Sequence, residues 1–256
     1  MILVLSGTSD GRDIVKALAA VGSEVLACAA TPYGARLLEG SGAARISGQP
    51  LSGAEFGRMI DESSINILVD ATHPYAEKIS VIAVEVCREK GIKYIRYQRP
   101  ASVVKEHPLV FHTDNYLEAA EKAAELGEVI FLATGSKTLG IFLGVAKRKG
   151  CRVVARLLPQ PEVLKKCMDL GLSPADIVAM QGPFSLELNT ALLRHYKASV
   201  LVTKDGGAPG GTEEKLSAAL RLGIPIVLVG RPASPPEAVE SIGDLLKKIN
   251  ETWVER

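Results

Sequence analysis

The sequence predicts an α/β protein in which parallel sheets are covered by helices on both faces. Three observations favour this class. Short runs of β-branched and apolar residues alternate with amphipathic segments along the chain, as expected for parallel strands joined by helices. Polar residues follow several of these runs, at the strand ends where open α/β sheets bind ligands. One sequence pattern also occurs twice, which favours two Rossmann-like domains with comparable ends.

The predicted strands are the short apolar runs, each bounded by turn residues or by an amphipathic segment. They cover residues 2–5, 24–29, 67–70, 94–97, 129–133, 152–157, 177–179, 200–203 and 225–229. The predicted helices carry apolar residues at helical spacing. They cover residues 11–20, 75–90, 115–126, 186–196 and 213–222, and a last helix follows the proline-rich turn at 231–236.

The repeated pattern reads Gly-Ile, six further residues and Arg-Pro, and it occupies residues 91–100 and 223–232. In each copy the glycine is expected to end a helix and a strand follows it. The Arg-Pro pair then lies at the carboxyl end of that strand. Coincidence is the alternative, because Gly-Ile-Pro before a buried strand is common, but we interpret the likeness as structural repetition.

The repetition predicts two domains. Residues 1–104 would form an N-terminal Rossmann-like domain that binds a dinucleotide, and residues 105–256 a C-terminal one that completes the substrate site. We expect a ligand cleft between the two domains, since such clefts commonly bind small molecules. Arg99 and Arg231, which end the two copies of the pattern, would both approach that cleft.

The composition excludes several classes of function. Lys and Arg total 30 against 29 acids, so the net charge of +1 gives no overall case for nucleic acid or an anionic membrane as partner. No apolar run reaches transmembrane length, and the first residues lack the basic leader of a signal peptide, so we expect a cytoplasmic protein. The 4 cysteines are scattered, which favours reduced thiols over disulfides or a metal site.

The first predicted turn reads Ser-Gly-Thr-Ser-Asp-Gly-Arg at residues 6–12, between a strand and a helix. Its glycines allow a tight turn and close helix packing, and free amides at a helix start can hold a pyrophosphate. The predicted cofactor-binding residues here are Ser6, Gly7, Thr8, Asp10, Gly11 and Arg12. The alternative is a glycine turn in which Ser9 or Asp10 caps the helix.

The second predicted strand is followed by no acid, since residues 27–33 read Ala-Cys-Ala-Ala-Thr-Pro-Tyr. Sites selective for NAD usually place an acid there to bind the ribose hydroxyls. Thr31 and Arg36 would tolerate a 2′-phosphate, and Thr31 is therefore counted with the cofactor site. The predicted cofactor is NADPH, with NADH as the alternative.

Residues 68–76 form the most informative stretch of the chain. They read Leu-Val-Asp-Ala-Thr-His-Pro-Tyr-Ala, an apolar run that ends in an acid and is followed by a proline where a helix would begin. This pattern predicts a buried strand that delivers polar groups to its carboxyl end. The alternative is an ordinary strand-to-helix turn that Thr72 or His73 caps.

Two loops in the second half also follow predicted strands. Gln181 at a strand end could bind a ligand, and Ser185 is a natural helix cap. Lys204 and Asp205 lead into a loop with four glycines within six residues. A lysine beside backbone amides favours an anion site, and the alternative is a solvated loop capped by Thr212.

Together these motifs resemble the precorrin-6A reductase family of cobalamin biosynthesis, whose members include cobalt-precorrin-6A reductases. The likeness covers essentially the whole chain and rests on residues 6–12, 70–76, 99–100, 181–185, 203–205 and 223–232. Two positions depart from the usual family pattern. Ser6 stands where the family usually has glycine, and Gly206 stands where it commonly has serine.

The resemblance implies that a nicotinamide cofactor delivers hydride to one carbon–carbon double bond of a ring-contracted tetrapyrrole, giving precorrin-6B or its cobalt form. The residues implied to bind this polycarboxylate are His73, Tyr75, Arg99, Gln181, Lys204, Asp205, Gly206, Gly207 and Arg231, and Thr72 joins the cofactor site. His73, Asp205 or a bound water would donate the proton that the reduction needs. Transient contacts with other enzymes of the pathway are a further expectation.

Two alternatives stay open at this point. One is a non-enzymatic two-domain protein that binds a small anion, although it would not need a glycine turn after the first strand. The other is a reductase of the dihydrodipicolinate reductase type, whose second domain would be an open mixed sheet.

Overall fold

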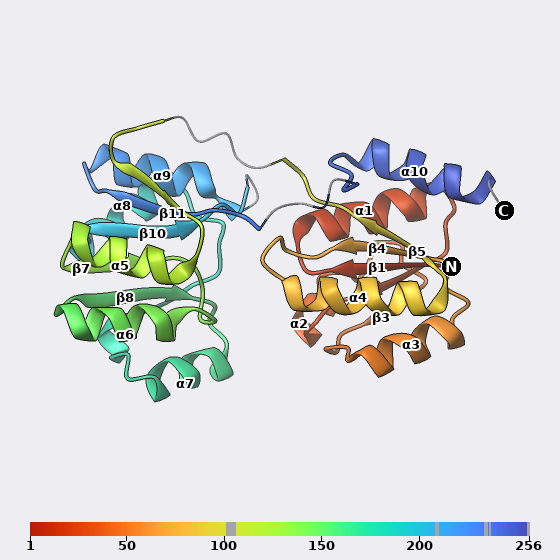
Figure 1. Ribbon diagram of the computed structural model, residues 1–256, viewed down its shortest axis with the longest axis horizontal. Coiled ribbons are helices and arrows are strands. Elements are labelled where there is room, and N and C mark those ends of the chain that lie inside the picture. The colour runs from red at the N-terminus through yellow and green to blue at the C-terminus, as the bar shows by residue number, and fades with distance from the viewer. Residues whose placement is uncertain (101–105, 208–209, 233–234, 236, 255–256) are drawn as a thin grey trace. The chain divides into compact units, whose positions relative to one another are not determined.

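The computed structural model describes residues 1–100, 106–207, 210–232, 235 and 237–254. The chain divides into two compact units, one made of Met1–Pro100 and Pro232–Arg256 and the other of Ala101–Arg231. Each unit has its own sheet and its own core, and each is described by itself below (Figure 1).

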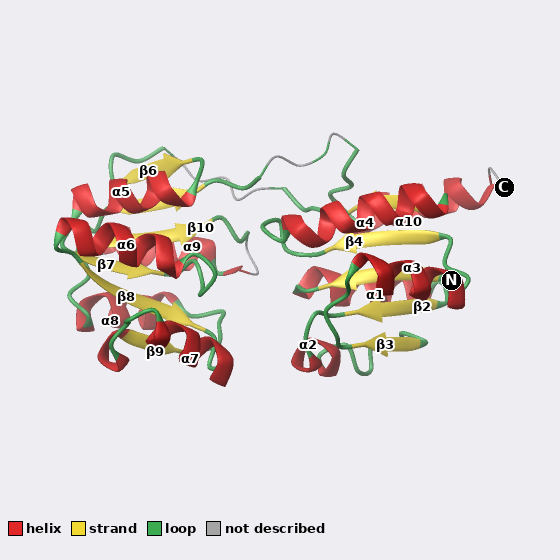
Figure 2. Cartoon of the chain, turned by 60° about the horizontal axis from the view of Figure 1, so that its bottom comes forward, coloured by secondary structure: helices red, strands yellow, loops and turns green. Residues whose placement is uncertain are grey.

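The first unit is built on a five-stranded parallel sheet in the order β3-β2-β1-β4-β5. Its strands are β1 (Ile2–Ser6), β2 (Val25–Cys28), β3 (Arg45–Ser47), β4 (Ile67–Ala71) and β5 (Lys93–Arg96), and its helices are α1 (Ser9–Ala20), α2 (Pro32–Arg36), α3 (Gly53–Glu62), α4 (Glu77–Lys90) and α10 (Ile242–Val254). Ile14 of α1 and Leu245 of α10 share the core on one face, and Phe56 of α3 and Ala83 of α4 share the core on the other. Figure 1 shows β1 and β4 between the layer of α1 and α10 and the layer of α3 and α4, and Figure 2 shows the strands side by side.

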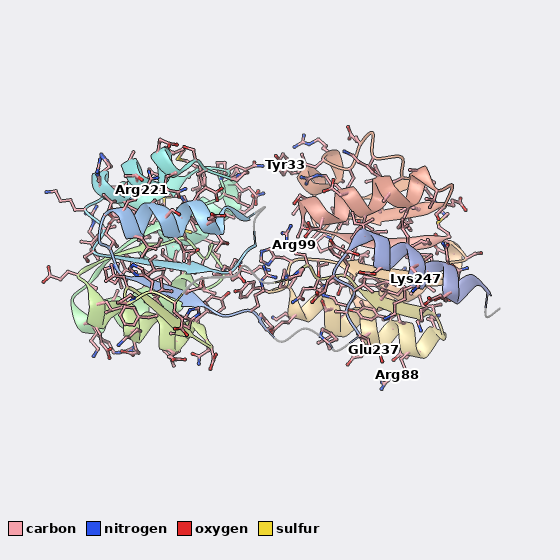
Figure 3. The ribbon with its side chains drawn as sticks, turned by 90° about the horizontal axis from the view of Figure 1, so that it is seen from above. Tyr33, Arg88, Arg99, Arg221, Glu237 and Lys247 are labelled. Carbon is pink, nitrogen blue, oxygen red and sulfur yellow. The ribbon has the colours of Figure 1, made fainter. Side chains whose placement is uncertain are left out.

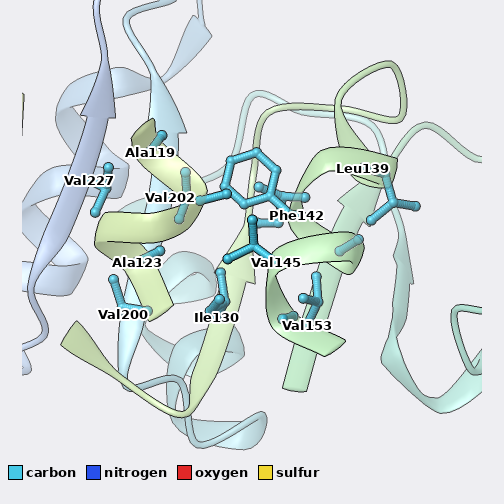
Figure 4. Packing of buried hydrophobic residues seen from close by; sticks show 14 of the residues in the cluster. Ala119, Ala123, Ile130, Leu139, Phe142, Val145, Val153, Val200, Val202 and Val227 are labelled. Carbon is cyan, nitrogen blue, oxygen red and sulfur yellow. The ribbon is translucent and has the colours of Figure 1, made fainter. Parts of the chain in front are cut away.

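The second unit has a six-stranded parallel sheet in the order β6-β11-β10-β7-β8-β9. Its strands are β6 (Val110–Thr113), β7 (Val129–Leu132), β8 (Arg152–Leu157), β9 (Ile177–Ala179), β10 (Val200–Lys204) and β11 (Ile226–Val229), and its helices are α5 (Tyr116–Leu126), α6 (Leu139–Lys149), α7 (Pro161–Asp169), α8 (Leu186–His195) and α9 (Thr212–Arg221). Phe142 and Val145 of α6 pack against Ile130 and Val153 on one face (Figure 4). Helices α8 and α9 cover the other face.

Both sheets reverse their strand order at an inner position. In the first unit the chain runs outward from β1 to β3 and then returns to place β4 beside β1. In the second unit it runs from β7 to β9 and returns to place β10 beside β7. The carboxyl ends of β1 with β4, and of β7 with β10, are therefore the positions where such sheets bind ligands.

The predicted fold class is confirmed, and several details are corrected. Strands β3 and β6 were not predicted, because Arg45 and Ile46 are exposed at a sheet edge and β6 is only partly buried, so neither reads as an apolar run. Helix α4 begins at Glu77 and not at the proline, because the amide of Ala76 closes a turn onto the carbonyl of His73.

The domain prediction is wrong for the last part of the chain. Residues 232–256, which the sequence assigned to the second domain, belong with the first unit. Leu245 and Ile249 of α10 are buried in the same core as α1, and Val239 forms a β-bridge with Tyr97. The predicted boundary at residues 104–105 falls in a segment outside the described residues. Among the described residues, no helix is both long enough and apolar enough to cross a membrane.

Candidate functional site

The first candidate site lies at the carboxyl ends of β1 and β4. These strands pair in parallel with Ser6 opposite Ala71, so the turns that follow them start side by side. The β1 turn contains Gly7 and Thr8, and the β4 turn contains Thr72 and His73. The structure therefore brings together residues that lie more than sixty positions apart in the chain.

Thr8 is the N-cap of α1, in place of the expected Ser9 or Asp10. Its Oγ1 accepts a hydrogen bond from the amide of Gly11 at 3.2 Å and donates one to the carbonyl of Ala71 at 3.2 Å. The same hydroxyl thus satisfies a free amide at the helix start and joins α1 to β4. The N-terminus of α1 therefore lies at the carboxyl ends of β1 and β4, where the strand order reverses.

Gly11 is where α1 approaches β1 most closely. A Cβ atom at this position would lie 2.8 Å from the Cβ of Ser6 and 2.9 Å from its Cα, distances that real Cβ atoms essentially never show. A Cβ atom at Gly7, in contrast, would meet no heavy atom within 4 Å. The tight packing at Gly11 and the open space beside Gly7 fit a turn whose backbone receives a pyrophosphate.

Asp10 and Arg99 form an ion pair, with 2.6 Å between Oδ1 and Nη1. The two side chains are 18% and 22% exposed. The sequence placed Asp10 in the cofactor site and Arg99 in the substrate site, so the pair links the two predicted sets within one unit. Figure 3 shows Arg99 and Tyr33 at the same end of the first unit.

Asp70 is fully buried and organises the β4 turn. Its Oδ1 accepts hydrogen bonds from the amide of Thr72 at 3.0 Å and from the Thr72 hydroxyl at 2.7 Å. Its Oδ2 accepts from Ser80 at 2.6 Å and from the Tyr94 hydroxyl at 2.8 Å. Burial, with the charge of Asp70, raises the pKa of Tyr94, so its hydroxyl stays a donor. These bonds hold the segment that carries His73.

Arg96 completes this network from the neighbouring strand. Its Nη1 lies 2.7 Å from Asp70 Oδ1, and both side chains are buried. It also donates to the hydroxyl of Thr72 at 3.0 Å, to the carbonyl of Thr72 at 3.1 Å and to Gln98 at 3.3 Å. Thr72 is therefore hydrogen-bonded to both Asp70 and Arg96. It does not cap α4, whose N-cap is Ala76.

Ser80, Tyr94, Arg96 and Gln98 were not predicted from the sequence as site residues. The available signal was an arginine inside a strand that otherwise reads as apolar and aromatic, next to a strand ending in a buried acid. Such an arginine needs a charged partner, and a buried aspartate one strand away supplies it.

His73 sits at the tip of the β4 turn and is partly buried. Its Nδ1 accepts a hydrogen bond from the amide of Tyr75 at 3.3 Å, and the two rings lie 5.4 Å apart. Because Nδ1 is an acceptor, the neutral ring carries its proton on Nε2.

Thr31 caps α2, since its Oγ1 accepts from the amide of Gly34 at 3.0 Å. Arg36 lies with its guanidinium 5.9 Å from the ring centroid of Tyr33. The segment from Cys28 to Tyr33 carries no acid, as the sequence indicated.

In the second unit, Asp205 and Arg231 form an ion pair at the ends of β10 and β11. Asp205 Oδ2 lies 3.0 Å from Arg231 Nε, and Oδ1 accepts from the amide of Gly207 at 3.0 Å. The amide of Gly206 donates to Thr212 at 3.1 Å. Gly211, in the left-handed conformation, is the N-cap of α9 in place of the expected Thr212.

The loop after β9 contains Gln181, which is exposed, and Ser185, which caps α8 as predicted by accepting from the amide of Leu188 at 3.3 Å. Two cations in this unit were missed by the sequence analysis. Arg156 on β8 and Lys215 on α9 are both buried. No cluster of His, Cys, Asp and Glu suited to a metal ion occurs among the residues that the structure describes.

Comparisons with known proteins agree on one family. The family model described as Precorrin-6x reductase CbiJ/CobK matches residues 1–250. A cobalt-precorrin-6A reductase from Methanothermobacter thermautotrophicus is 39% identical over 248 residues, covering 95% of this chain and 80% of the relative. Another, from Priestia megaterium, is 39% identical over 233 residues, or 91% of each protein. A solved structure titled CobK precorrin-6A reductase has a TM-score of 0.76 at 24% identity and covers 98% of this chain and 96% of its own, which supports the fold.

Proposed function

The chain belongs to the precorrin-6x reductase family and is an oxidoreductase, and we propose that it reduces one carbon–carbon double bond of cobalt-precorrin-6A or precorrin-6A with a nicotinamide cofactor. The family match over residues 1–250 carries this proposal. The cobalt form is our first choice, because both relatives at 39% identity are named for it. Membership of a reductase family displaces the alternative of a non-enzymatic anion-binding protein.

Anaerobic incubation tests the substrate directly. We expect the pigment spectrum to change only when protein, a tetrapyrrole and a reduced nicotinamide are all present, with matching loss of nicotinamide absorbance. Tetrapyrroles with and without cobalt are compared at equal concentration. No spectral change with either pigment would rule out the proposed reaction.

The β1–α1 turn is the proposed cofactor site. When bound, the nicotinamide cofactor supplies the hydride. Gly7 and the first amides of α1 would hold the pyrophosphate, the Thr8 hydroxyl joins that helix start to β4, and Gly11 lets it lie close to β1. Ser6, Asp10, Arg12, Thr31 and Thr72 complete the proposed set.

We predict that NADPH is preferred to NADH. No acid follows β2 to bind a free 2′-hydroxyl, and Arg36 lies on the next helix. The expected preference in kcat/KM is about tenfold, or about 1.4 kcal/mol. Arg36→Ala should reduce it. Equal or better turnover with NADH at matched concentrations would contradict the prediction.

His73 is the proposed proton donor. Donation requires the imidazolium form, which passes one ring proton to the substrate and is left as the neutral imidazole, and the Asp70 network fixes the turn that carries it. Asp205 and a bound water are the other candidates, but the Asp205 carboxylate is already engaged by Arg231 and by the amide of Gly207.

We predict that His73→Ala slows hydride transfer far more than it weakens the cofactor. General acid catalysis typically contributes about 10²–10⁴-fold in rate, so single-turnover reduction should slow within that range. NADPH affinity, measured by equilibrium dialysis, should stay nearly unchanged. The matched control is His195→Ala, at an exposed histidine of the second unit. It should change neither the single-turnover rate nor the NADPH affinity. Wild-type single-turnover rates in His73→Ala would exclude it as the donor.

The remaining predicted residues are proposed to bind the tetrapyrrole. Lys204 ends β10, and Gly206 and Gly207 lie in the loop that follows it, where their amides donate to Thr212 and Asp205. Arg231 is held by Asp205, while Tyr75, Arg99 and Gln181 complete the proposed set. The expected cleft between two domains stays a prediction.

A further inference from the structure

Two buried cations of the second unit have no role in the function proposed above. Arg156, near the carboxyl end of β8, is 9% exposed, and Lys215, in α9, is 8% exposed. Lysine and arginine are almost never so buried unless they are paired with an opposite charge.

Arg156 is held by neutral groups. Its Nη1 donates to Asn189 Oδ1 at 2.7 Å, and its guanidinium lies 4.5 Å from the ring centroid of Phe184. Asn189 is itself fixed, because its amide donates to the carbonyls of Phe184 at 3.2 Å and Ser185 at 2.8 Å. Within the described part of the chain, no carboxylate forms an ion pair with Arg156. The guanidinium is thus positioned but its charge is not neutralised.

The helix that carries Lys215 begins beside Phe184, since a Cβ atom at Gly211 would lie 4.0 Å from the Phe184 nitrogen, and the ring of Phe184 faces the Arg156 guanidinium. Burial, and then the charges of Arg156 and Lys204, lower the pKa of Lys215 to about 8, while Glu214 and Asp205 act in the opposite direction. Across the described residues, no group accepts a hydrogen bond from its ammonium. The side chain also sits near the N-terminus of α9, where the helix dipole disfavours a positive charge.

The charges around Lys215 do not balance. Among the described residues no carboxylate forms an ion pair with Arg156 or Lys215, and the nearby Asp205 is engaged by Arg231. A buried excess of positive charge is costly for the protein alone. Natural proteins retain such costly groups mainly where a ligand or reaction needs them.

We propose that Arg156 and Lys215 form a carboxylate-binding subsite for the tetrapyrrole substrate, with Lys204 beside it. The inference rests on the proposed function for the identity of the ligand. A guanidinium fixed by Asn189 and stacked on Phe184 is suited to a planar carboxylate, and the lysine supplies a second charged donor. The subsite lies among the cationic strand ends already proposed for the substrate, and none of its contacts depends on the cofactor site.

Lys215→Met tests the subsite through kinetics. We expect KM for cobalt-precorrin-6A to rise at least about tenfold, or about 1.4 kcal/mol, with little change in KM for NADPH. Lys215→Arg should retain most of the affinity, because it keeps the charge. Lys165→Met, at a lysine that is 74% exposed on α7, is the matched control and should leave both KM values unchanged.

Thermal unfolding shows whether Lys215 binds the substrate or stabilises the fold. Methionine removes an uncompensated buried charge at similar length, so without ligand the Tm of Lys215→Met should equal or exceed that of the wild type. A marked fall in Tm together with the rise in KM would assign Lys215 to stability and overturn the proposal. Wild-type KM for the pigment in both Lys215→Met and Arg156→Met would overturn it as well.

A second probe does not depend on the proposed reaction. Propane-1,2,3-tricarboxylate, added against sodium chloride of equal ionic strength, should raise the Tm of the wild type and of Lys165→Met but not that of Lys215→Met. If the wild type reduces no tetrapyrrole, a Tm rise that depends on Lys215 still supports a carboxylate subsite while the proposed function fails. A rise of equal size in Lys215→Met would overturn the subsite whatever the enzyme reduces.

Discussion

Gly11→Val is expected to abolish productive cofactor binding while the protein remains folded. The valine Cβ would lie 2.9 Å from the Ser6 Cα, so α1 must move away from β1. Overpacking of this kind costs about 1–3 kcal/mol of stability, which a chain with two extensive cores can absorb. The displaced helix start would no longer present its amides to a pyrophosphate. KM for NADPH should rise far more than KM for the pigment, as steady-state kinetics will measure.

Gly144→Val provides the control for this variant. Gly144 also lies within a helix, α6, but a Cβ atom there would meet no heavy atom within 4 Å. This substitution should leave KM for NADPH at the wild-type value. A folded Gly11→Val protein with wild-type NADPH affinity would remove the β1–α1 turn from the cofactor site.

Arg96→Met should produce the largest loss of stability among the variants considered. It removes the partner of Asp70, whose carboxylate is fully buried, and leaves that charge with only neutral donors. Breaking a buried ion pair in this way costs about 3–5 kcal/mol. Thr72 also loses the two hydrogen bonds that Arg96 donates to it. Urea denaturation, monitored by circular dichroism, will measure the loss in the free energy of unfolding.

A surface pair in the same unit gives the comparison. Lys90 and Asp61 form an ion pair with side chains 35% and 57% exposed, and Lys90→Met should cost only about 0–1 kcal/mol. If Arg96→Met cost no more than Lys90→Met, the Asp70 network would not be what holds the β4 turn. We also expect slower turnover in Arg96→Met, because His73 stands on that turn.

The sequence predicted the buried strands best. β1, β4 and β10 match the predicted runs to within one residue at each end, because strands covered on both faces read as continuous apolar segments. The exposed β3 has no such signal, since Arg45 and Ile46 face water at the sheet edge. The cap of α1 also escaped prediction. Thr8, Ser9 and Asp10 are all good capping residues, and the choice depends on backbone angles that sequence does not reveal.

The candidate site was predicted only where its residues are contiguous. The turns with Gly11 and His73 were recognisable from local patterns. The partners that hold them were not, because Asp70 and Arg96 are 26 positions apart and meet only through the pairing of β4 with β5. Arg156 and Lys215 were missed for the same reason, since a charged residue in a predicted strand or helix reveals neither its burial nor its neighbours.

The return of the chain to the first unit has a consequence for biosynthesis. A ribosome makes residues 1–100 before the second unit, yet the core of the first unit also contains Leu245 and Ile249 of α10, which are made after the second unit. The second unit, Ala101–Arg231, is continuous in sequence and has all its strands before α10 exists. Because domains generally fold as units during translation, the second unit can reach its native state while residues 1–100 still lack the apolar side chains of α10 in their core.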